Sequence, residues 1–384
     1  MYNGTITFNK IIAPINRRKF KKIVDKYGGD IGVKGFTCWH HFISILFGQI
    51  ANCNSLRTIE NTLQYQQNSH YHLGIKAKIA RSTISYANKT RNWCIYRDLF
   101  FELLQEVKLK DMTQSRQVIT LLDASPINLF GRGHEWAEKT LRITGLKLHM
   151  LYNLDARLPI YFDITGAKTN DINIGRHINI KAGSTYVFDK GYADYNWWYS
   201  IDRQKAYFVT RLKSNAKKEV LEERAVCGAI LQDATIRIGS KTPRGGKHND
   251  YCDKPLRMIV VNREDNTLLT LVTNDFVRTS EEIAVLYKQR WQIELFFKWI
   301  KQNLKIKRFL SRNENAIKTQ ICIALIYYVL LRIAQVLKTV CAKLSLSLLH
   351  VIVSNTVFVK DQLRSSLKRS HSHPHQLLFN FNSS

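Results

Sequence analysis

Residues 287–312 read YKQRWQIELFFKWIKQNLKIKRFLSR, a stretch with eight Lys or Arg residues and a single acid, Glu294. Its polar residues recur at steps of three and four, which places them along one face of a helix. That cationic face comprises Tyr287, Arg290, Glu294, Lys298, Lys301, Lys305, Arg308 and Arg312. The opposite, apolar face comprises Leu286, Ile293, Phe297, Ile300 and Leu304. The pattern predicts a helix that packs on a sheet and presents its cations to a polyanion.

Glu294 has two interpretations within this stretch. It could serve as the i,i+4 partner of Arg290 and Lys298, at about 0.3–0.5 kcal/mol for each pair. A helix built on such pairs would alternate its charges, whereas here like charges dominate and repel one another unless a polyanion lies against them. Neighbouring cations also favour the ionised carboxylate, which is the form that binds a metal ion. The sequence therefore favours a metal ligand at this position over a simple salt bridge.

Two aspartates far upstream share a local pattern. Asp123 follows the apolar run ITLL and Asp189 follows TYVF, so each is expected at the carboxyl end of a strand. Such strand ends collect in one crevice of an α/β sheet. A close pair of carboxylates is unfavourable without a cation, and oxygen-only ligands favour Mg²⁺ or Mn²⁺. Asp163, Asp171 and Asp194 remain rival ligands on pattern alone.

Composition indicates a protein that binds a polyanion. The 384 residues contain 58 Lys plus Arg against 30 Asp plus Glu, a formal net charge of +28. DNA or RNA is the default partner of so basic a chain, and an anionic membrane surface is the weaker alternative. The 45% of hydrophobic residues is enough for packed cores.

Several features favour a cytoplasmic protein without a membrane segment. The apolar run ICIALIYYVLL at 321–331 is shorter than the roughly 20 residues that span a bilayer, so we expect a buried helix there. The first residues lack the pattern of a signal peptide. The seven cysteines contain no C-x-x-C pair, which argues against a zinc ribbon or a disulfide framework and fits a reducing compartment.

The spacing of apolar residues and the expected secondary structure divide the chain into three regions. Residues 1–112 show helical apolar spacing and are expected to form an N-terminal DNA-binding domain. A short basic helix after Ser82 would be its recognition helix. The alternative is a helical domain with ordinary surface charges. Residues 113–312 mix strands and helices, which predicts an α/β core with a β-rich insertion at 213–274. Residues 313–384 are expected to form C-terminal helices with a polar tail.

These motifs together resemble a known family. The residues Tyr287, Arg290, Glu294 and Lys301 match the signature Y-x2-R-x3-E-x6-K of the DDE transposases of bacterial insertion sequences, specifically the insertion-sequence-four family. LLDASPINL at 121–129 and VFDKGYAD at 187–194 resemble that family's two aspartate motifs. The N-terminal stretch is similar to the small domain that precedes many such catalytic cores.

The resemblance implies a fold, a site and a reaction. It implies an RNase H-like core in which Asp123, Asp189 and Glu294 form the catalytic triad. These three residues would bind Mg²⁺ or Mn²⁺, as two ions about 3.5–4 Å apart. DNA-binding residues would be Tyr287, Arg290, Lys298, Lys301, Lys305 and Arg308. The implied partners are double-stranded DNA, as terminal inverted repeats and target, and a second copy of the chain in a synaptic homodimer. The implied reaction is cut-and-paste transposition, with hairpin ends and joining of 3′-hydroxyls to the target.

Departures from the family pattern leave alternatives. The first motif reads Asp-Ala-Ser-Pro where many relatives have Ser/Thr-Thr after the Asp, and 213–274 holds no Trp to stack a flipped base. Trp197, Trp198 and Trp291 are candidates for that role, although packing is the expected one. A nuclease or resolvase without transposition, or a non-catalytic DNA-binding derivative of a transposase, remains the alternative function.

Overall fold

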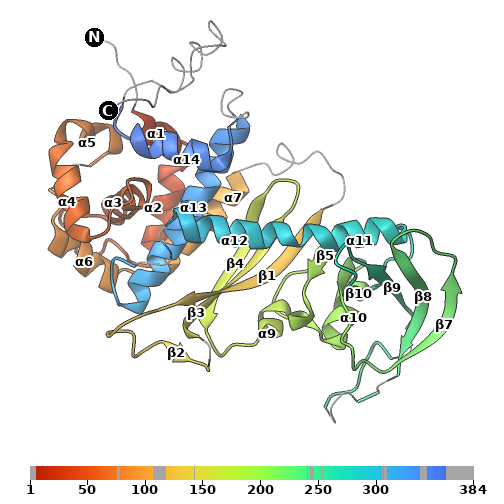
Figure 1. The fold of residues 1–384 in the computed structure, drawn as a ribbon. Coiled ribbons are helices and arrows are strands. Elements are labelled where there is room, and N and C mark those ends of the chain that lie inside the picture. Colours follow the sequence, from red (N-terminus) through yellow and green to blue (C-terminus); the bar gives the residue numbers. More distant parts are fainter. Residues whose placement is uncertain are drawn as a thin grey trace, which may run out of the picture. The chain divides into compact units, whose positions relative to one another are not determined.

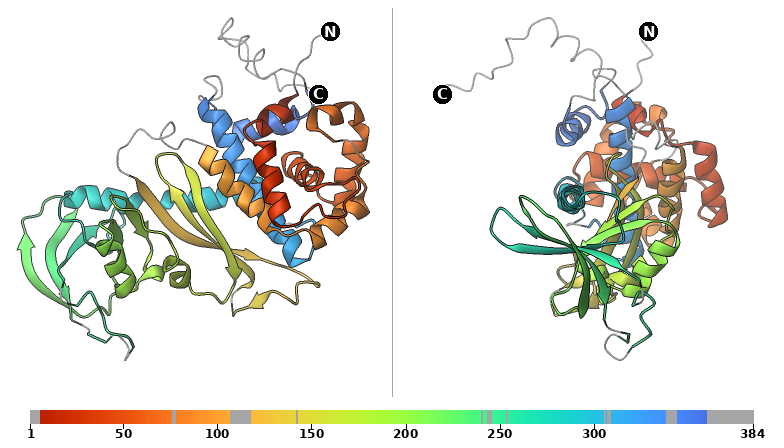
Figure 2. Two further views of the ribbon diagram at one scale, coloured as in Figure 1. Left: turned by 180° about the vertical axis from the view of Figure 1, so that it is seen from behind. Right: turned by 90° about the vertical axis from the view of Figure 1, so that its right-hand side faces the viewer.

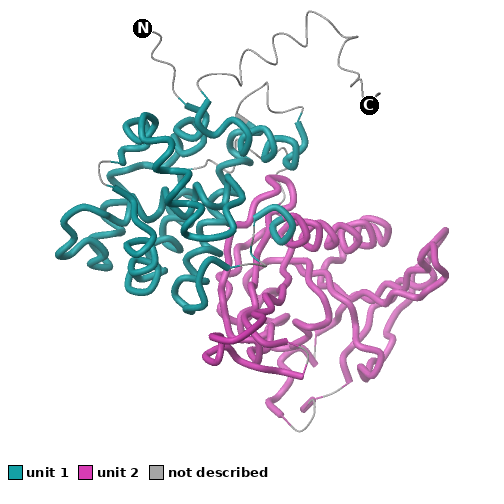
Figure 3. The backbone as a smooth tube through the Cα atoms, turned by 60° about the vertical axis from the view of Figure 1, so that its left-hand side comes forward, with its two compact units in different colours: residues 1–108, 300–384 teal, residues 109–299 magenta. Residues whose placement is uncertain are grey.

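The computed structural model describes residues 6–75, 78–106, 118–141, 143–239, 241–242, 246–252, 254–304, 306, 309–337 and 344–359. The chain forms two compact units, which Figure 3 colours separately. One comprises residues 1–108 and 300–384, and the other comprises residues 109–299. The C-terminal helices thus group with the N-terminal ones instead of forming the third region expected from sequence. The expected boundary at residue 112 and the polar tail lie outside the described residues.

The first unit is helical (Figure 1). Its helices are α1 (Thr7–Ile12), α2 (Arg17–Lys26), α3 (Cys38–Ile50), α4 (Leu56–Tyr65), α5 (Gln67–Leu73), α6 (Arg81–Thr90), α7 (Cys94–Glu106), α13 (Glu314–Leu337) and α14 (Leu346–Asn355). All thirteen residues of α3 are buried. A capping box at Thr37 and His40 begins that helix by satisfying its first N–H groups.

The long apolar helix α13 belongs to the core of this unit. It packs on α1, α3, α6 and α7, which are far from it in sequence, and on the following helix α14. Within the part of the chain that the structure describes, it is the one helix long and apolar enough to cross a membrane, yet 83% of its apolar window is buried inside the protein. The expectation of a buried helix is therefore confirmed. The helix extends beyond the apolar run 321–331 on both sides, so its burial, not the shortness of that run, identifies it as a core helix.

The second unit is built on one ten-stranded sheet of order β2-β3-β1-β5-β6-β10-β9-β8-β7, with β4 also paired to β3. Its strands are β1 (Ile119–Asn128), β2 (Glu138–Lys139), β3 (Thr144–Asn153), β4 (Leu158–Gly166), β5 (Thr185–Phe188), β6 (Tyr207–Arg211), β7 (Lys218–Arg224), β8 (Ile230–Ile238), β9 (Leu256–Asn262) and β10 (Leu268–Thr273). Its helices are α9 (Asp171–Gly175), the 3-10 turn η1 (Lys190–Tyr192), α10 (Tyr195–Arg203), α11 (Ser280–Gln289) and most of α12 (Trp291–Asn303).

The strand directions confirm the expected mixed α/β, RNase H-like class. Strands β1, β3 and β4 form an antiparallel meander, and β5 and β6 then run parallel to β1. The β-rich segment expected at 213–274 is present as β7 to β10. These strands do not form a separate domain, because β10 pairs with β6 and the four strands extend the same sheet.

Helices cover both faces of this sheet (Figure 2). Directly paired residues on neighbouring strands point to the same face. Leu121, Val187 and Val209 form one such row; they are fully buried on the face that α11 covers through its contacts with β5 and β6. Leu122 and Phe188 lie on the opposite face, in a cluster with residues of α10. Tyr152, the partner of Leu121, contacts the Phe296 ring of α12, so α12 lies on the α11 side.

Candidate active site

Asp123 lies in the middle of β1, and the expectation that it ends a strand was wrong. Strand β1 continues to Asn128 because β3 stays paired with it as far as Gly145. The parallel pairing of β1 with β5, by contrast, stops at Leu122 and Phe188. Asp123 is therefore the first residue beyond the end of its parallel partner. Its Oδ1 atom accepts a hydrogen bond from the N–H of Ala124 at 2.8 Å.

Asp189 directly follows β5, as expected. The register that pairs Leu122 with Phe188 brings the next residues, Asp123 and Asp189, alongside one another. Neighbouring strands lie about 4.8 Å apart, so the two carboxylates are close. The chain then turns away through η1. On the helical side, the Tyr287 hydroxyl of α11 donates to Asp189 Oδ1 at 3.4 Å.

Glu294 reaches the same site from α12, where an arginine already pairs with it. Arg290 Nη2 lies 2.6 Å from Glu294 Oε1, and Arg290 Nη1 lies 3.9 Å from Asp123 Oδ2. Arg290 itself keeps helical dihedrals (φ −51°, ψ −31°) between α11 and α12, which preserves the helical spacing from Tyr287 to Glu294. The expected pair of Glu294 with Arg290 is thus present, and the charge of Glu294 acts on Asp123. Its role as a metal ligand stays a prediction.

The electrostatics of Asp123 reflect this crowding. The pKa of Asp123 is raised to about 6, chiefly by burial, and the charges of Glu294 and Asp189 act in the same direction. The Ala124 N–H and the Arg290 guanidinium oppose the rise. Burial also raises the pKa of Tyr287 to about 12, and the charge of Asp189 acts in the same direction. Asp123 is therefore a carboxylate whose ionised form needs a nearby cation.

The three carboxylates suit a divalent cation by their chemistry. They supply only oxygen atoms, which Mg²⁺ and Mn²⁺ prefer. Among the residues that the structure describes, no three His, Cys, Asp or Glu side chains are already arranged to hold a metal ion. The Glu294 carboxylate is paired with the Arg290 guanidinium. Glu294 would have to leave Arg290 in order to complete a metal site.

The rival aspartates lie elsewhere. Asp163 pairs with His149, which pairs with Ala124, so Asp163 points to the opposite face of the sheet from Asp123. Asp171 forms an ion pair with Lys147 at 3.1 Å. Asp194 caps α10 through its bond to the Trp197 N–H and also pairs with Arg176.

The cationic face of the helix is shorter than expected. The apolar face is buried throughout, at Leu286, Ile293, Phe297, Ile300 and Leu304. Helix α12, however, ends at Asn303, a poor helix former, so the predicted helical face does not continue to residue 312. Lys298 is exposed and Lys301 is half-buried on α12. Lys305 and Arg308 lie outside the described residues.

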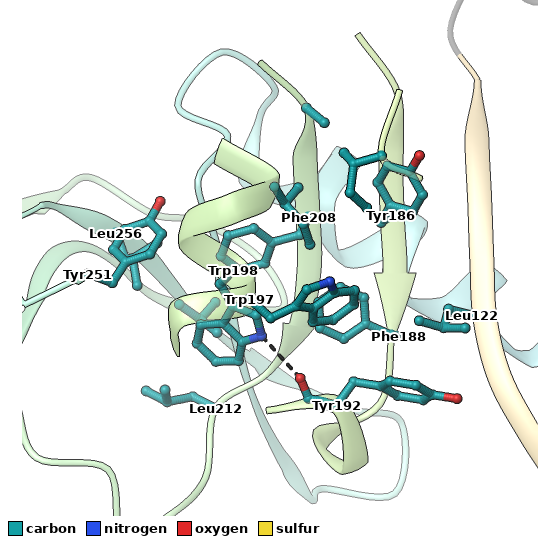
Figure 4. Close-up of a cluster of buried hydrophobic side chains, with 14 of the residues drawn as sticks. Leu122, Tyr186, Phe188, Tyr192, Trp197, Trp198, Phe208, Leu212, Tyr251 and Leu256 are labelled. Carbon is teal, nitrogen blue, oxygen red and sulfur yellow. Dashed lines mark hydrogen bonds between the residues drawn. The ribbon is translucent and has the colours of Figure 1, made fainter. Parts of the chain in front are cut away.

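The tryptophans considered for base stacking divide into two kinds. Trp197 and Trp198 are buried in the core with Phe188, and Trp198 Nε1 donates to the Tyr192 carbonyl at 3.3 Å (Figure 4). Packing accounts for both, as expected. Trp291 is 56% exposed at the start of α12.

Arg211 was missed by the sequence analysis. It ends β6, and the register that pairs Val187 with Val209 places it level with Asp189. Its charge opposes the rise in the pKa of Tyr287, which places it near that hydroxyl. No motif marks this residue, since only the pairing of β5 with β6 reveals its position.

Comparison with known proteins agrees with this geometry. The family described as "Transposase DDE domain" matches residues 114–330, and a domain of unknown function, DUF4372, matches residues 3–76. A piggyBac transposase synaptic complex with hairpin DNA aligns with 100% of this chain and 87% of its own, at a TM-score of 0.48 and 12% identity. That structural likeness is too weak to bear on function.

Three similar proteins are named as transposases, which agrees with the family match. A Sinorhizobium fredii protein named as the transposase y4zB is 42% identical over 254 residues, which cover 65% of this chain and 69% of that protein. A Synechocystis protein named as the transposase of insertion sequence element IS4SA is 28% identical over 263 residues, covering 66% and 71% respectively. A Geobacillus stearothermophilus protein named for element IS5377 is 28% identical over 56% of each chain. The chain therefore belongs to the DDE transposases of bacterial insertion sequences.

Proposed function

We propose that this transposase cuts the ends of its own insertion sequence and joins the freed 3′-hydroxyls to target DNA, with Asp123, Asp189 and Glu294 as its catalytic residues. The observation that carries the proposal is the register that brings Asp123 and Asp189 alongside one another beneath the helices that bear Tyr287 and Glu294. The relatives named for insertion sequence elements support the substrate.

The three carboxylates would hold Mg²⁺ or Mn²⁺, in one or two ions. When bound, such ions activate a water or a 3′-hydroxyl and stabilise the leaving oxygen. Asp123 and Asp189 are preplaced by the sheet. Glu294 would join them after Arg290 releases it, and the high negative charge density at Asp123 favours this exchange of one cation for another.

Arg290 would then move to the DNA. Its Nε atom is buried and has no hydrogen-bond partner within the described part of the chain, so a phosphate oxygen would satisfy it. Tyr287 would keep Asp189 in place through its hydroxyl. Lys298 and Lys301 follow on the same helix and would bind the backbone further along; we extend this role to Lys305 and Arg308 from the sequence alone.

The helical unit would recognise the terminal inverted repeats. Helix α6 buries Ile84, Ala87 and Asn88 and exposes residues that include Arg81, Ser85, Tyr86 and Lys89. From residue 61 to residue 97 the chain has no acid. A firmly packed helix with a polar, acid-free outer face is suited to a DNA groove.

The remaining steps follow from the family. We propose cut-and-paste transposition with hairpin ends, carried out by a homodimer in the cytoplasm on nucleoid DNA. The packing of α13 within its own unit makes that helix core, so the dimer would form through other surfaces.

The testing experiment is cleavage of a duplex that carries the flanking end of the element, with Mg²⁺, by wild type and by Glu294→Gln. DNA binding should persist and strand cleavage should disappear in the variant. Asp163→Asn is the matched control, since that aspartate lies on the opposite face and its variant should cut normally. If Glu294→Gln cuts as well as wild type, the assignment of the triad fails. Cutting without joining to target DNA would favour a nuclease that does not transpose.

A further inference from the structure

A strongly basic cavity of about 410 Å³ lies beside the carboxylates in the second unit. Its wall includes four cations, Lys190, Arg211, Lys213 and Lys218, and no acid. Ser214 and Thr270 add hydroxyl groups that can donate hydrogen bonds. Cations combined with hydroxyl donors are the chemistry that binds phosphate.

The sheet register ties this cavity to the catalytic aspartates. Lys190 directly follows Asp189, and Arg211 lies level with Asp189 on the next strand. Asp123 on β1, Asp189 directly after β5 and Arg211 on β6 thus lie at one level, and neighbouring strands are about 4.8 Å apart. Lys190 and Arg211 therefore line the cavity and also neighbour the Asp189 carboxylate.

A second cavity, of about 670 Å³, continues around the same loop. Lys213 and Asn215 line both cavities, so residues 212–217 separate them. The second cavity adds Lys217 and Lys247 to its wall. Arg176 also lines it but is paired with Asp194. The two cavities form a basic track that leads from the carboxylates around this loop.

The cations of the track differ from four other cations of this unit that are neutralised by aspartates. Lys147 and Lys254 each pair with an aspartate, as do Arg257 and Arg278. Lys190, Arg211, Lys213, Lys217 and Lys218 form no ion pair with any acid in the part of the chain that the structure describes. Like charges gathered in this way repel one another, and an extended anion would remove the repulsion.

We propose that residues 212–217, which we call the basic loop, hold the phosphodiester backbone of the DNA strand next to the scissile phosphate. The inference rests on the proposed function and names a part of the substrate that this loop binds. A single small phosphate would use only one cavity. Two cavities that share Lys213 and Asn215 suit a chain of regularly spaced phosphates instead.

The test compares two double variants of the full-length protein. Lys213→Gln with Lys217→Gln removes two cations of the basic loop. Lys181→Gln with Lys205→Gln removes two exposed cations that precede β5 and β6, at the opposite ends of the same strands. The change in net charge is equal. Binding to a short duplex from the flanking end of the element is measured over a range of salt concentrations, together with ethylation interference at each phosphate.

The basic-loop variant should lower the slope of log affinity against log salt by about 1.8, at about 0.9 per lost phosphate contact. It should also lose ethylation interference selectively at phosphates next to the cut. Equal slopes in the two double variants, or an interference pattern unchanged from wild type, would overturn the proposal. Lys213→Arg with Lys217→Arg should restore the slope, which excludes a folding defect. Loss of cleavage in Glu294→Gln, measured on the same DNA, tests the catalytic proposal separately.

Discussion

Arg290 holds Glu294 by an ion pair of 2.6 Å between Nη2 and Oε1, and the same guanidinium lies 3.9 Å from Asp123 Oδ2. In the protein alone, this arginine provides the positive charge that two crowded carboxylates require. A divalent cation would compete with it for Glu294. Binding of DNA would assist the cation, because a phosphate can draw the guanidinium away.

We therefore expect Arg290→Met to bind Mn²⁺ more tightly than wild type in the absence of DNA. An ion pair of this exposure contributes up to about 1 kcal/mol, which corresponds to roughly a fivefold gain in affinity. DNA binding should weaken in the same variant. Titration calorimetry with Mn²⁺ measures the first effect, and Glu294→Gln, which removes a ligand, is the control that should lose affinity. Weaker Mn²⁺ binding by Arg290→Met would show that the arginine supports the metal site.

Tyr287→Phe should reduce cleavage while leaving the fold intact. The variant loses the 3.4 Å hydrogen bond to Asp189 Oδ1, and such a bond contributes about 0.5–1.5 kcal/mol. If that bond orients Asp189, the cleavage rate should fall by up to about tenfold with little change in the thermal midpoint. Single-turnover cleavage on saturating DNA measures this rate. An unchanged rate would mean that the sheet alone orients Asp189.

The helical stripe and the family motifs allowed much of this site to be predicted. The burial of Ile293, Phe297 and Ile300 follows from their spacing, because an amphipathic helix must cover its apolar face. Asp189 was placed at the end of a strand because an apolar run of β-forming residues meets a turn there. These predictions succeeded because they depend only on residues that are close together in the sequence.

Strand pairing accounts for what could not be predicted. Asp123 lies within β1 because β3 holds that strand beyond the aspartate, and no local signal marks the far end of such pairing. Arg211 and Lys213 neighbour the carboxylates only through the register of β5 with β6. The end of α12 at Asn303 was missed because charge spacing alone continued past it.

Asn315 joins two parts of the helical unit, and Asn315→Ala should destabilise it. Its amide nitrogen donates to the carbonyls of Asn88 at 2.9 Å and Arg91 at 2.6 Å, and its oxygen accepts from the Trp93 N–H at 3.0 Å. Truncation leaves these backbone groups unpaired at a cost of about 1–3 kcal/mol. Asn61→Ala, an exposed change on α4, should stay within about 0.5 kcal/mol of wild type. Urea unfolding measures the stability of both variants. Equal unfolding midpoints would contradict a stabilising role of the Asn315 hydrogen bonds.

His41 is a fully buried imidazole in the same unit. Its Nδ1 lies 2.7 Å from the Tyr96 hydroxyl and its Nε2 lies 2.7 Å from Asn88 Oδ1. A neutral ring satisfies both contacts when Nε2–H donates to the amide oxygen and Nδ1 accepts from the phenol. Burial lowers the pKa of His41 to about 3, and the charge of Arg91 acts in the same direction.

Acid should therefore destabilise this unit. The unfolded chain takes up a proton on His41 near its ordinary pKa of 6.5, whereas the folded chain does not do so until about pH 3. Stability from this group is complete above pH 6.5 and declines as the pH falls, by about 2 kcal/mol between pH 6.5 and pH 5. His41→Gln, which can retain both hydrogen bonds, should flatten the pH dependence of the free energy of unfolding. His72→Gln, a half-buried histidine of the same unit, serves as the control. The same slope in wild type and His41→Gln would mean that other groups control the acid sensitivity.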